Sequence, residues 1–190
     1  MIFYTLLDEN SNRHTEHDAA YKLLSYVLEK YYGITSFQTK KNEHGKPYLK
    51  NNTGIFFNIS HCKGLAVCGI SEKEIGVDAE YFRSYNEKVM KRIFSDSEQD
   101  HVLSSDDPKE YFFRIWTLKE ALGKYMGTGL FSGLKEFSFS FTDAGDPVCE
   151  KTEGTFFSQK ILHEKWVISV CAHDPENEFV FINKTCFCSS

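Results

Sequence analysis

Apolar residues recur at helical spacing in two long stretches of the chain. Residues 16–32 repeat leucine, valine, alanine and tyrosine with a period near 3.6 up to Gly33, which predicts a helix that ends at this glycine. Residues 109–126 show the same period between Pro108 and Gly127, which are typical of a helix start and a helix end. We therefore expect two long helices that lie far apart in the sequence.

Short apolar runs separated by turns predict strands around these helices, at residues 2–7, 55–59, 65–70, 75–81, 156–162, 166–171 and 179–182. Residues 137–141 alternate Phe with Ser, as in a strand with one buried face. Residues 85–104 predict short helices broken near Ser95, which forms a capping-box pattern with Glu98. Residues 39–54 are rich in Gly, Asn and Pro and are expected to form a loop. These patterns predict an α+β fold with mainly antiparallel sheets.

The composition narrows the classes of protein to which the chain can belong. Its 190 residues suffice for one domain or two small fused halves, and 17 Phe and 10 Tyr supply a large core. A net charge of -5 argues against general nucleic-acid binding. The chain shows neither a signal peptide nor an apolar run long enough to span a membrane. The six cysteines form no CxxC pair and no zinc-ligand spacing, so we expect free thiols and a cytoplasmic location.

Two carboxylates in the run Gly76-Val77-Asp78-Ala79-Glu80 are the first candidates for chemistry. Side chains alternate along a strand, so Asp78 and Glu80 point to one face. Two carboxylates on one face repel each other unless they are solvated, protonated or bridged by a cation. An oxygen-ligated Mg²⁺ would suit them. The alternative is that both side chains are solvated at a strand end.

The second long helix carries three charged residues of interest. Glu120 and Lys124 are four residues apart and can touch, which by itself indicates no more than a surface ion pair. Lys119 falls at the edge of the apolar stripe. A lysine there either extends to solvent or meets a buried anion.

Two further segments could bind phosphate. Ser60 and His61 end the run Phe57–His61, and a hydroxyl and an imidazole can both donate hydrogen bonds to a phosphate. Lys46, between Gly45 and Pro47, is a point charge in a loop that allows close approach. Each segment has an ordinary alternative, a solvated turn.

Taken together, the four segments GKPY, FNISH, GVDAE and WTLKEALGK occur in an order that closely resembles the 4′-phosphopantetheinyl transferases, in particular the surfactin-type subfamily of single-chain pseudo-dimers. The segments RIFSDSEQ and MGTGL also resemble the family, and the resemblance covers about residues 16–142. It implies two similar α/β halves related by a pseudo-twofold axis, at residues 1–83 and 84–190, with the active site between them. A monomer is expected, because the second half supplies what a partner subunit would.

The resemblance also implies an activity. Enzymes of this family transfer the phosphopantetheine arm of coenzyme A to a serine of an acyl or peptidyl carrier protein and release adenosine 3′,5′-bisphosphate. By this resemblance Asp78, Glu80 and Glu120 would bind Mg²⁺ or Mn²⁺, and Glu120 would be the general base. Lys119 and Lys124 would hold the pyrophosphate and stabilise the leaving group.

The expected cradle for the 3′-phosphate of coenzyme A is less complete. Lys46, Ser60 and His61 match it, and Lys22 is the best candidate for a contact from the first helix. The family usually has more basic residues near the start of that helix than the segment NRHTEHDAAYK offers. Affinity for the 3′-phosphate is therefore the weakest part of the resemblance.

A basic helix is expected to receive the carrier protein, which is typically acidic. Lys88, Lys91 and Arg92 follow the carboxylate strand closely, and the alternative is an ordinary solvated helix face. Three other functions stay open: a module that binds coenzyme A without transfer, a Mg²⁺-dependent phosphohydrolase, and a structural protein with solvated charges. Modification of a carrier serine would distinguish the transferase from all three.

Overall fold

The computed structural model describes residues 1–50, 54–128, 132–175 and 177–187. Its elements in chain order are β1 (Ile2–Leu6), α1 (Arg13–Tyr32), β2 (Thr39–Lys41), β3 (Pro47–Leu49), β4 (Phe56–Cys62), β5 (Leu65–Ser71), β6 (Ile75–Tyr81), α2 (Glu87–Ile93), α3 (Asp96–Ser104), α4 (Pro108–Met126), η1 (Ser132–Glu136), β7 (Ser140–Phe141), β8 (Pro147–Val148), β9 (Phe156–Leu162), β10 (Trp166–Ala172), β11 (Phe179–Phe181) and η2 (Lys184–Cys186).

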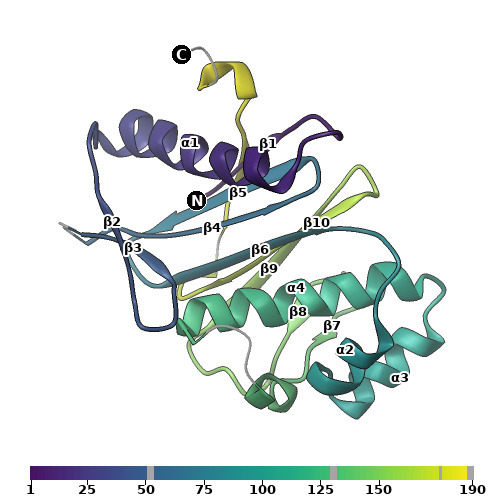
Figure 1. Ribbon diagram of the computed structural model, residues 1–190. Helices are drawn as coiled ribbons and strands as arrows, with labels where there is room; N and C mark the ends of the chain where they lie inside the picture. The colour runs from purple at the N-terminus through teal and green to yellow at the C-terminus, as the bar shows by residue number, and fades with distance from the viewer. Residues whose placement is uncertain (51–53, 129–131, 176, 188–190) are drawn as a thin grey trace.

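Two similar halves stack as four layers (Figure 1). In each half a strand leads through a long helix and a small hairpin into two longer strands: β1, α1, β2–β3, β4, β5 and then β6, α4, β7–β8, β9, β10. The strand orders also match, with β5 between β1 and β4, and β10 between β6 and β9. The helix α1 covers one sheet, α4 covers the other, and the two sheets face each other. The α+β fold with two similar halves is confirmed.

Local sequence signals fix the ends of both long helices. Asn12 caps α1 by accepting a hydrogen bond from the backbone of Thr15, and Asp107 caps α4 before Pro108. The helices end at Gly33 and Gly127, whose φ angles of 69° and 70° lie in the left-handed region that glycine adopts without strain. The predicted capping box of Ser95 and Glu98 is present at α3.

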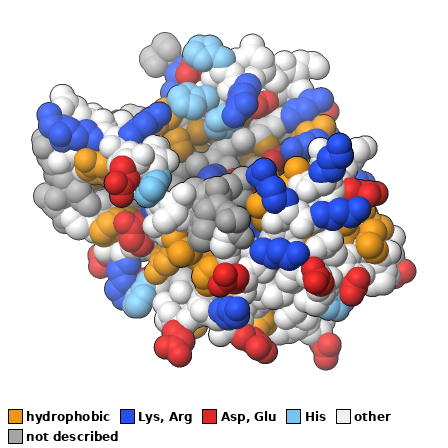
Figure 2. Space-filling model, turned by 60° about the horizontal axis from the view of Figure 1, so that its bottom comes forward, with side chains coloured by type: hydrophobic (Ala, Val, Ile, Leu, Met, Phe, Trp, Pro, Cys, Tyr) orange, Lys and Arg blue, Asp and Glu red, His pale blue; other side chains and the backbone are white. Residues whose placement is uncertain are grey.

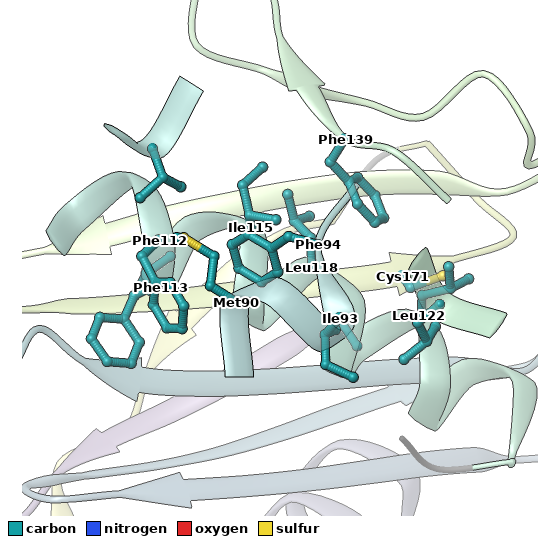
Figure 3. Packing of buried hydrophobic residues seen from close by; sticks show 14 residues of the cluster. Met90, Ile93, Phe94, Phe112, Phe113, Ile115, Leu118, Leu122, Phe139 and Cys171 are labelled. Atoms are coloured by element: carbon teal, nitrogen blue, oxygen red, sulfur yellow. The ribbon is translucent and has the colours of Figure 1, made fainter. Parts of the chain in front are cut away.

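The apolar stripe of α4 packs into the larger of the two helix-covered cores (Figure 3). Ile115, Leu118 and Leu122 are at most 2% exposed and meet Met90 of α2 and Cys171 of β10 in this cluster. Burial of each such side chain stabilises the fold by about 1.5–3 kcal/mol. The same burial fixes the opposite face of α4, which carries Glu120 and Lys124.

Gly76 lets α4 lie directly on β6. A Cβ atom at this position would stand 2.0 Å from the carbonyl oxygen of Ala121 and 2.5 Å from the amide nitrogen of Tyr125. Real Cβ atoms do not approach backbone atoms so closely, so only glycine permits this contact. Because side chains alternate along a strand, Asp78 and Glu80 share the face of Gly76 and are turned towards α4.

The fold differs from the expected elements in two places. Residues 39–54 contain the hairpin β2–β3 where a loop is predicted, while residues 51–53 lie outside the described part. Only Ser140–Phe141 of the predicted strand 137–141 is a strand. The Phe137 carbonyl accepts a hydrogen bond from Lys119 of α4, and the Phe139 amide donates one to Glu98 of α3, so these groups are not available for strand pairing. The strand β11 pairs with β1 in parallel, while the other described strand pairs are antiparallel, as the prediction of mainly antiparallel sheets requires.

The junction between the halves follows from strand pairing. The strand β6 bonds to β10 and begins the second sheet, so pairing groups Ile75–Tyr81 with the second half. The division into residues 1–83 and 84–190 stays a prediction. Within the described residues, every helix is too short or too polar to cross a membrane.

Candidate active site

A cavity of about 520 Å³ opens between the two halves. The first half contributes the start of α1 and the end of β4 to its wall, and the second half contributes β6, the segment after it, and α4. Six of the nine predicted site residues line this cavity: Ser60, His61, Asp78, Glu80, Glu120 and Lys124. Segments far apart in the sequence thus meet at one concave site, as is usual for small-molecule sites.

Asp78 and Lys124 form the link between β6 and α4. The Lys124 Nζ donates hydrogen bonds to Asp78 Oδ1 at 2.7 Å, to the Val77 carbonyl at 3.0 Å and to Ser60 Oγ at 3.1 Å. Ser60 Oγ in turn donates to Asp78 Oδ1 at 2.8 Å. The lysine is thereby held over the carboxylate, while its side chain stays 27% exposed on the cavity side.

Glu80 is paired with a residue that was not among the predicted site residues. Arg83 NH1 lies 2.5 Å from Glu80 Oε2, and NH2 lies 3.2 Å from Oε1, so the guanidinium grips both carboxylate oxygens. Burial raises the pKa of Glu80, and the hydrogen bond from Arg83 opposes this rise. The carboxylate is therefore held by Arg83 at the cavity wall.

Glu120 is the carboxyl group most perturbed by its surroundings. Its pKa is raised to about 7: burial is the largest cause, the charges of Asp78 and Glu80 add to the rise, and Lys124 opposes it. A carboxyl group with a pKa near neutrality can take up and release a proton at physiological pH. Strong perturbation in a cavity is also typical of functional carboxylates.

The donor set of this wall suits a divalent cation. Asp78, Glu80 and Glu120 share this part of the cavity, and the repulsion between them adds to burial in raising the pKa of Glu80 and Glu120. A Mg²⁺ ion prefers such oxygen donors together with phosphate oxygens and would relieve the repulsion. In the described residues, however, no three His, Cys, Asp or Glu side chains already form a metal-holding group. Asp78, Glu80 and Glu120 fit the ion by chemistry, and binding requires rearrangement of side chains.

The other end of the cavity carries His61 opposite an unexpected carboxylate. Glu16 of α1 is buried, accepts a hydrogen bond from Ser11 at 3.0 Å, and lies 3.9 Å from His61 Nδ1. That nitrogen is itself buried without a hydrogen-bond partner. Burial, together with nearby His17, lowers the pKa of His61. His61 therefore has an unused polar atom at the cavity wall.

Lys119 lies in the core, which differs from the expected contact with pyrophosphate. Its Nζ forms an ion pair with Glu98 at 2.9 Å and donates to the carbonyls of Leu134 and Phe137, and both charged side chains are 0% exposed. Burial lowers the pKa of Lys119, while Glu98 raises it. Lys119 therefore joins α4 to α3 and η1. The buried anion that it meets is the Glu98 carboxylate and not a phosphate of a ligand.

Lys46 and Lys22 also lie away from this cavity. The Lys46 Nζ bonds to Glu74 at 2.5 Å and to the carbonyls of Ile75 and Tyr125 at 3.3 Å, so it joins the β2–β3 hairpin to the end of α4. Lys22 lines a separate groove near the start of α1. The expected cradle of two lysines and two polar side chains is therefore reduced here to Ser60 and His61.

Four charged cavity residues had no role in the sequence-based prediction: Arg13, Glu16, Lys63 and Arg83. The spacing of Glu80 and Arg83 was a usable signal, because residues three apart at the end of a strand can pair across a turn. Glu16 gave no such signal. Its burial depends on α1 packing beside β4.

Comparison with known proteins places the chain in a family. The family profile described as the 4′-phosphopantetheinyl transferase superfamily matches residues 74–171. A 4′-phosphopantetheinyl transferase of Bacillus subtilis is 32% identical over 139 residues, which cover 70% of this chain and 62% of the relative. The transferase Sfp of Bacillus subtilis strain 168 is 27% identical over 173 residues, covering 85% and 77%. HetI of Nostoc is 35% identical over 130 residues, covering 63% and 54%.

The matched region contains the carboxylate strand and the helix that bears Glu120 and Lys124. The chain spans 62% of the length of the first of these relatives. Because the family profile matches about half of the chain, from β6 to β10, the chain belongs to the 4′-phosphopantetheinyl transferase superfamily.

Proposed function

We propose that the chain transfers the 4′-phosphopantetheine arm of coenzyme A to a serine hydroxyl of an acyl or peptidyl carrier protein. Membership in the superfamily supports this activity. The observation that carries the proposal is the meeting of Asp78, Glu80, Glu120 and Lys124 in one cavity between the halves. Carboxylates beside a lysine suit the handling of a diphosphate and of a hydroxyl proton.

In the proposed reaction Glu120 takes the proton of the carrier serine hydroxyl. The serine oxygen then bonds to the β-phosphorus of coenzyme A, and the bond from that phosphorus to adenosine 3′,5′-bisphosphate breaks. A pKa of about 7 suits Glu120 to this role, because it is partly ionised at neutral pH and returns the proton readily. The cavity aligns the two reactants, which contributes much of the rate.

Lys124 is proposed to stabilise the leaving bisphosphate. Its ammonium group already faces the cavity and is fixed by Asp78 and Ser60, so little reorganisation is needed when negative charge develops. Bound Mg²⁺ or Mn²⁺ would neutralise diphosphate charge, and Asp78, Glu80 and Glu120 would hold it. Ser60 and His61 are proposed to contact phosphate oxygens of coenzyme A.

The basic side of the molecule near α2 is the proposed docking surface for the carrier protein. Lys88, Lys91 and Arg92 are exposed, while Met90 and Ile93 anchor the helix in the core. Figure 2 shows Lys and Arg side chains gathered on the right of this face, the side on which α2 lies in Figure 1. Such a patch can attract an acidic partner although the chain carries a net charge of -5.

A monomer in the cytoplasm is part of the proposal. One chain supplies both halves of the cavity wall, so a second subunit is not needed to complete it. The five described cysteines are free thiols, and three of them are buried, which suits a reducing compartment.

The test is incubation with coenzyme A, Mg²⁺ and an apo carrier protein, with the intact mass of the carrier as readout. We expect a gain equal to one phosphopantetheine arm, lost when the carrier serine is replaced by alanine and strongly slowed in Glu120→Gln. Binding of coenzyme A without a change of carrier mass would indicate a binding module. Phosphate release without carrier modification would indicate a phosphohydrolase.

A further inference from the structure

Both carboxylate oxygens of Glu80 are occupied by one guanidinium. Arg83 NH1 and NH2 bond to Oε2 and Oε1 at 2.5 and 3.2 Å, and NH1 also donates to the Tyr81 carbonyl at 3.2 Å. This arrangement is the two-pronged geometry in which arginine binds carboxylate best. The guanidinium takes up one lone pair of each Glu80 oxygen and places a positive charge beside the carboxylate, which opposes the approach of a second cation.

Aromatic rings hold Arg83 in this position. Its guanidinium carbon lies 5.2 Å from the centre of the Tyr81 ring and 4.8 Å from that of Phe113. Both distances are within the range of cation–π attraction. The side chain is nevertheless 40% exposed, so it can leave Glu80 without breaking into the core.

The Glu80–Arg83 pair also lies between two cavities. Both residues line the active-site cavity, and both line an adjoining cavity of about 190 Å³ whose wall includes Phe112, Phe113 and Trp116. A shift of the arginine therefore changes the shape of both spaces. No other cation in the described cavity wall grips a carboxylate through both of its oxygens.

We propose that Arg83 is a positioning residue that holds Glu80 in the cation-free protein and competes with the divalent cation for it. The inference rests on the proposed role of Glu80 as a cation ligand. A cation at Glu80 then meets the charge of the guanidinium and has to share or displace its hydrogen bonds, which weakens binding of the free ion and makes occupancy of the site depend on additional partners such as a diphosphate. Arg83 thus sets how readily the site fills before coenzyme A arrives.

The test compares Mn²⁺ binding by the full chain without coenzyme A, measured by the loss of the electron paramagnetic resonance signal of free Mn²⁺. Arg83→Ala should bind Mn²⁺ about two- to fivefold more tightly than the unaltered protein, the range expected for losing a partly exposed ion pair. Arg83→Lys keeps the charge without the two-pronged grip and should fall between them.

Lys63→Ala is the matched control. Lys63 also lines the cavity and lies 5.9 Å from the Tyr81 ring, but it forms no ion pair with a carboxylate among the described residues. If Lys63→Ala raises the affinity for Mn²⁺ as much as Arg83→Ala does, the effect is only the removal of a positive charge and the proposal is overturned. Weaker Mn²⁺ binding by Arg83→Ala than by the unaltered protein would also overturn it.

The outcomes separate this inference from the proposed function. Unaltered protein that binds Mn²⁺ with the same affinity as Arg83→Ala contradicts the competition alone and leaves the transferase intact. Absence of Mn²⁺ binding in every variant contradicts the competition and the cation site together. Binding that appears only in Arg83→Ala supports the competition in its strongest form.

Discussion

The two halves of the molecule share one order of elements and differ in the chemistry they carry. In the first half, β1 consists of apolar residues, one Tyr and one Thr, and α1 covers its sheet with Leu23, Leu24, Val27 and Leu28. In the second half, β6 carries Asp78 and Glu80, and α4 adds Glu120 and Lys124 on the face turned to that strand.

The difference shows that two halves with the same architecture can contribute different chemical groups to one site. The second half concentrates the carboxylates and the lysine, while the first half closes the cavity with Ser60, His61 and the start of α1. Clustering three carboxylates costs stability, as the raised pKa of Glu120 indicates. Packing elsewhere in the fold has to offset that cost.

Neutralising the acidic residues of the second half should have the largest effect on activity, and it tests whether that half carries the catalytic groups. Glu120→Gln and Asp78→Asn should each lower the transfer rate by about 10²–10⁴-fold, because they remove the proposed base or a cation ligand. Ser60→Ala, the control in the first half, removes one hydroxyl that positions Asp78 and should lower the transfer rate only about tenfold. Equal losses in the three variants would contradict the division of roles, and carrier mass measured over time is the readout.

A second comparison concerns two strand glycines. Gly76→Ala should destabilise the fold by about 3 kcal/mol or more, because the new Cβ meets α4 backbone atoms that cannot move aside. Gly69→Ala on β5 places its Cβ 2.7 Å from Val77 Cγ1 and 3.0 Å from Ile75 Cδ1, which are side-chain atoms, and should cost about 1 kcal/mol. Urea unfolding measures both, and a smaller loss for Gly76→Ala would show that α4 is not seated on β6 as described.

Two lysines on α4 separate stability from catalysis. Lys119→Met leaves Glu98 buried without its partner and should cost about 3 kcal/mol or more of unfolding free energy. Lys124→Met leaves Asp78 with its hydrogen bond from Ser60 and should cost about 1–2 kcal/mol, less than Lys119→Met, while it lowers the transfer rate about 100-fold. The reverse pattern, with a stable Lys119→Met that no longer binds coenzyme A, would restore the pyrophosphate role for Lys119.

The pH dependence of stability tests the environment of Glu120. Its pKa is raised from 4.5 to about 7 in the folded protein, so the folded state binds this proton more tightly than the unfolded state does. The resulting stabilisation is complete below pH 4.5 and is lost as the pH rises to about 7, up to roughly 3 kcal/mol at 1.36 kcal/mol per pH unit.

Glu120→Gln keeps the shape of the side chain without its charge. It should be more stable than the unaltered protein by up to about 3 kcal/mol at pH 8, with little difference at pH 4.5. Glu43→Gln is the control, since the Glu43 side chain is 86% exposed. If the difference in unfolding free energy between Glu120→Gln and the unaltered protein does not change with pH, the pKa of Glu120 is not raised in the folded protein.

Hydrophobic periodicity and capping signals were sufficient to predict most of the fold. They located both long helices, the capping box at Ser95 and the strand over residues 75–81 with its correct bounds. The duplicated architecture was implied only by family resemblance, because the halves share an order of elements and no visible sequence repeat. The hairpin β2–β3 escaped detection because its strands are three residues each and its first strand is fully exposed.

The site was predictable where chemistry and strand alternation coincide. Asp78 and Glu80 share a face because of the strand period, and Glu120 and Lys124 because of the helix period. Lys119 was correctly singled out as a lysine that meets a buried anion or extends to solvent. That its anion is Glu98 depends on how α3 packs against α4, which no local pattern in the sequence reveals.

The central claim is that Asp78, Glu80 and Glu120 share one divalent cation at a diphosphate. The most direct test is a crystal grown with coenzyme A and Mn²⁺, in which the anomalous scattering of manganese marks the ion. We predict a single strong peak bound by oxygens of all three side chains and of the coenzyme A diphosphate. A coenzyme A molecule bound with no manganese peak, or with Glu120 turned away from the peak, would contradict the claim.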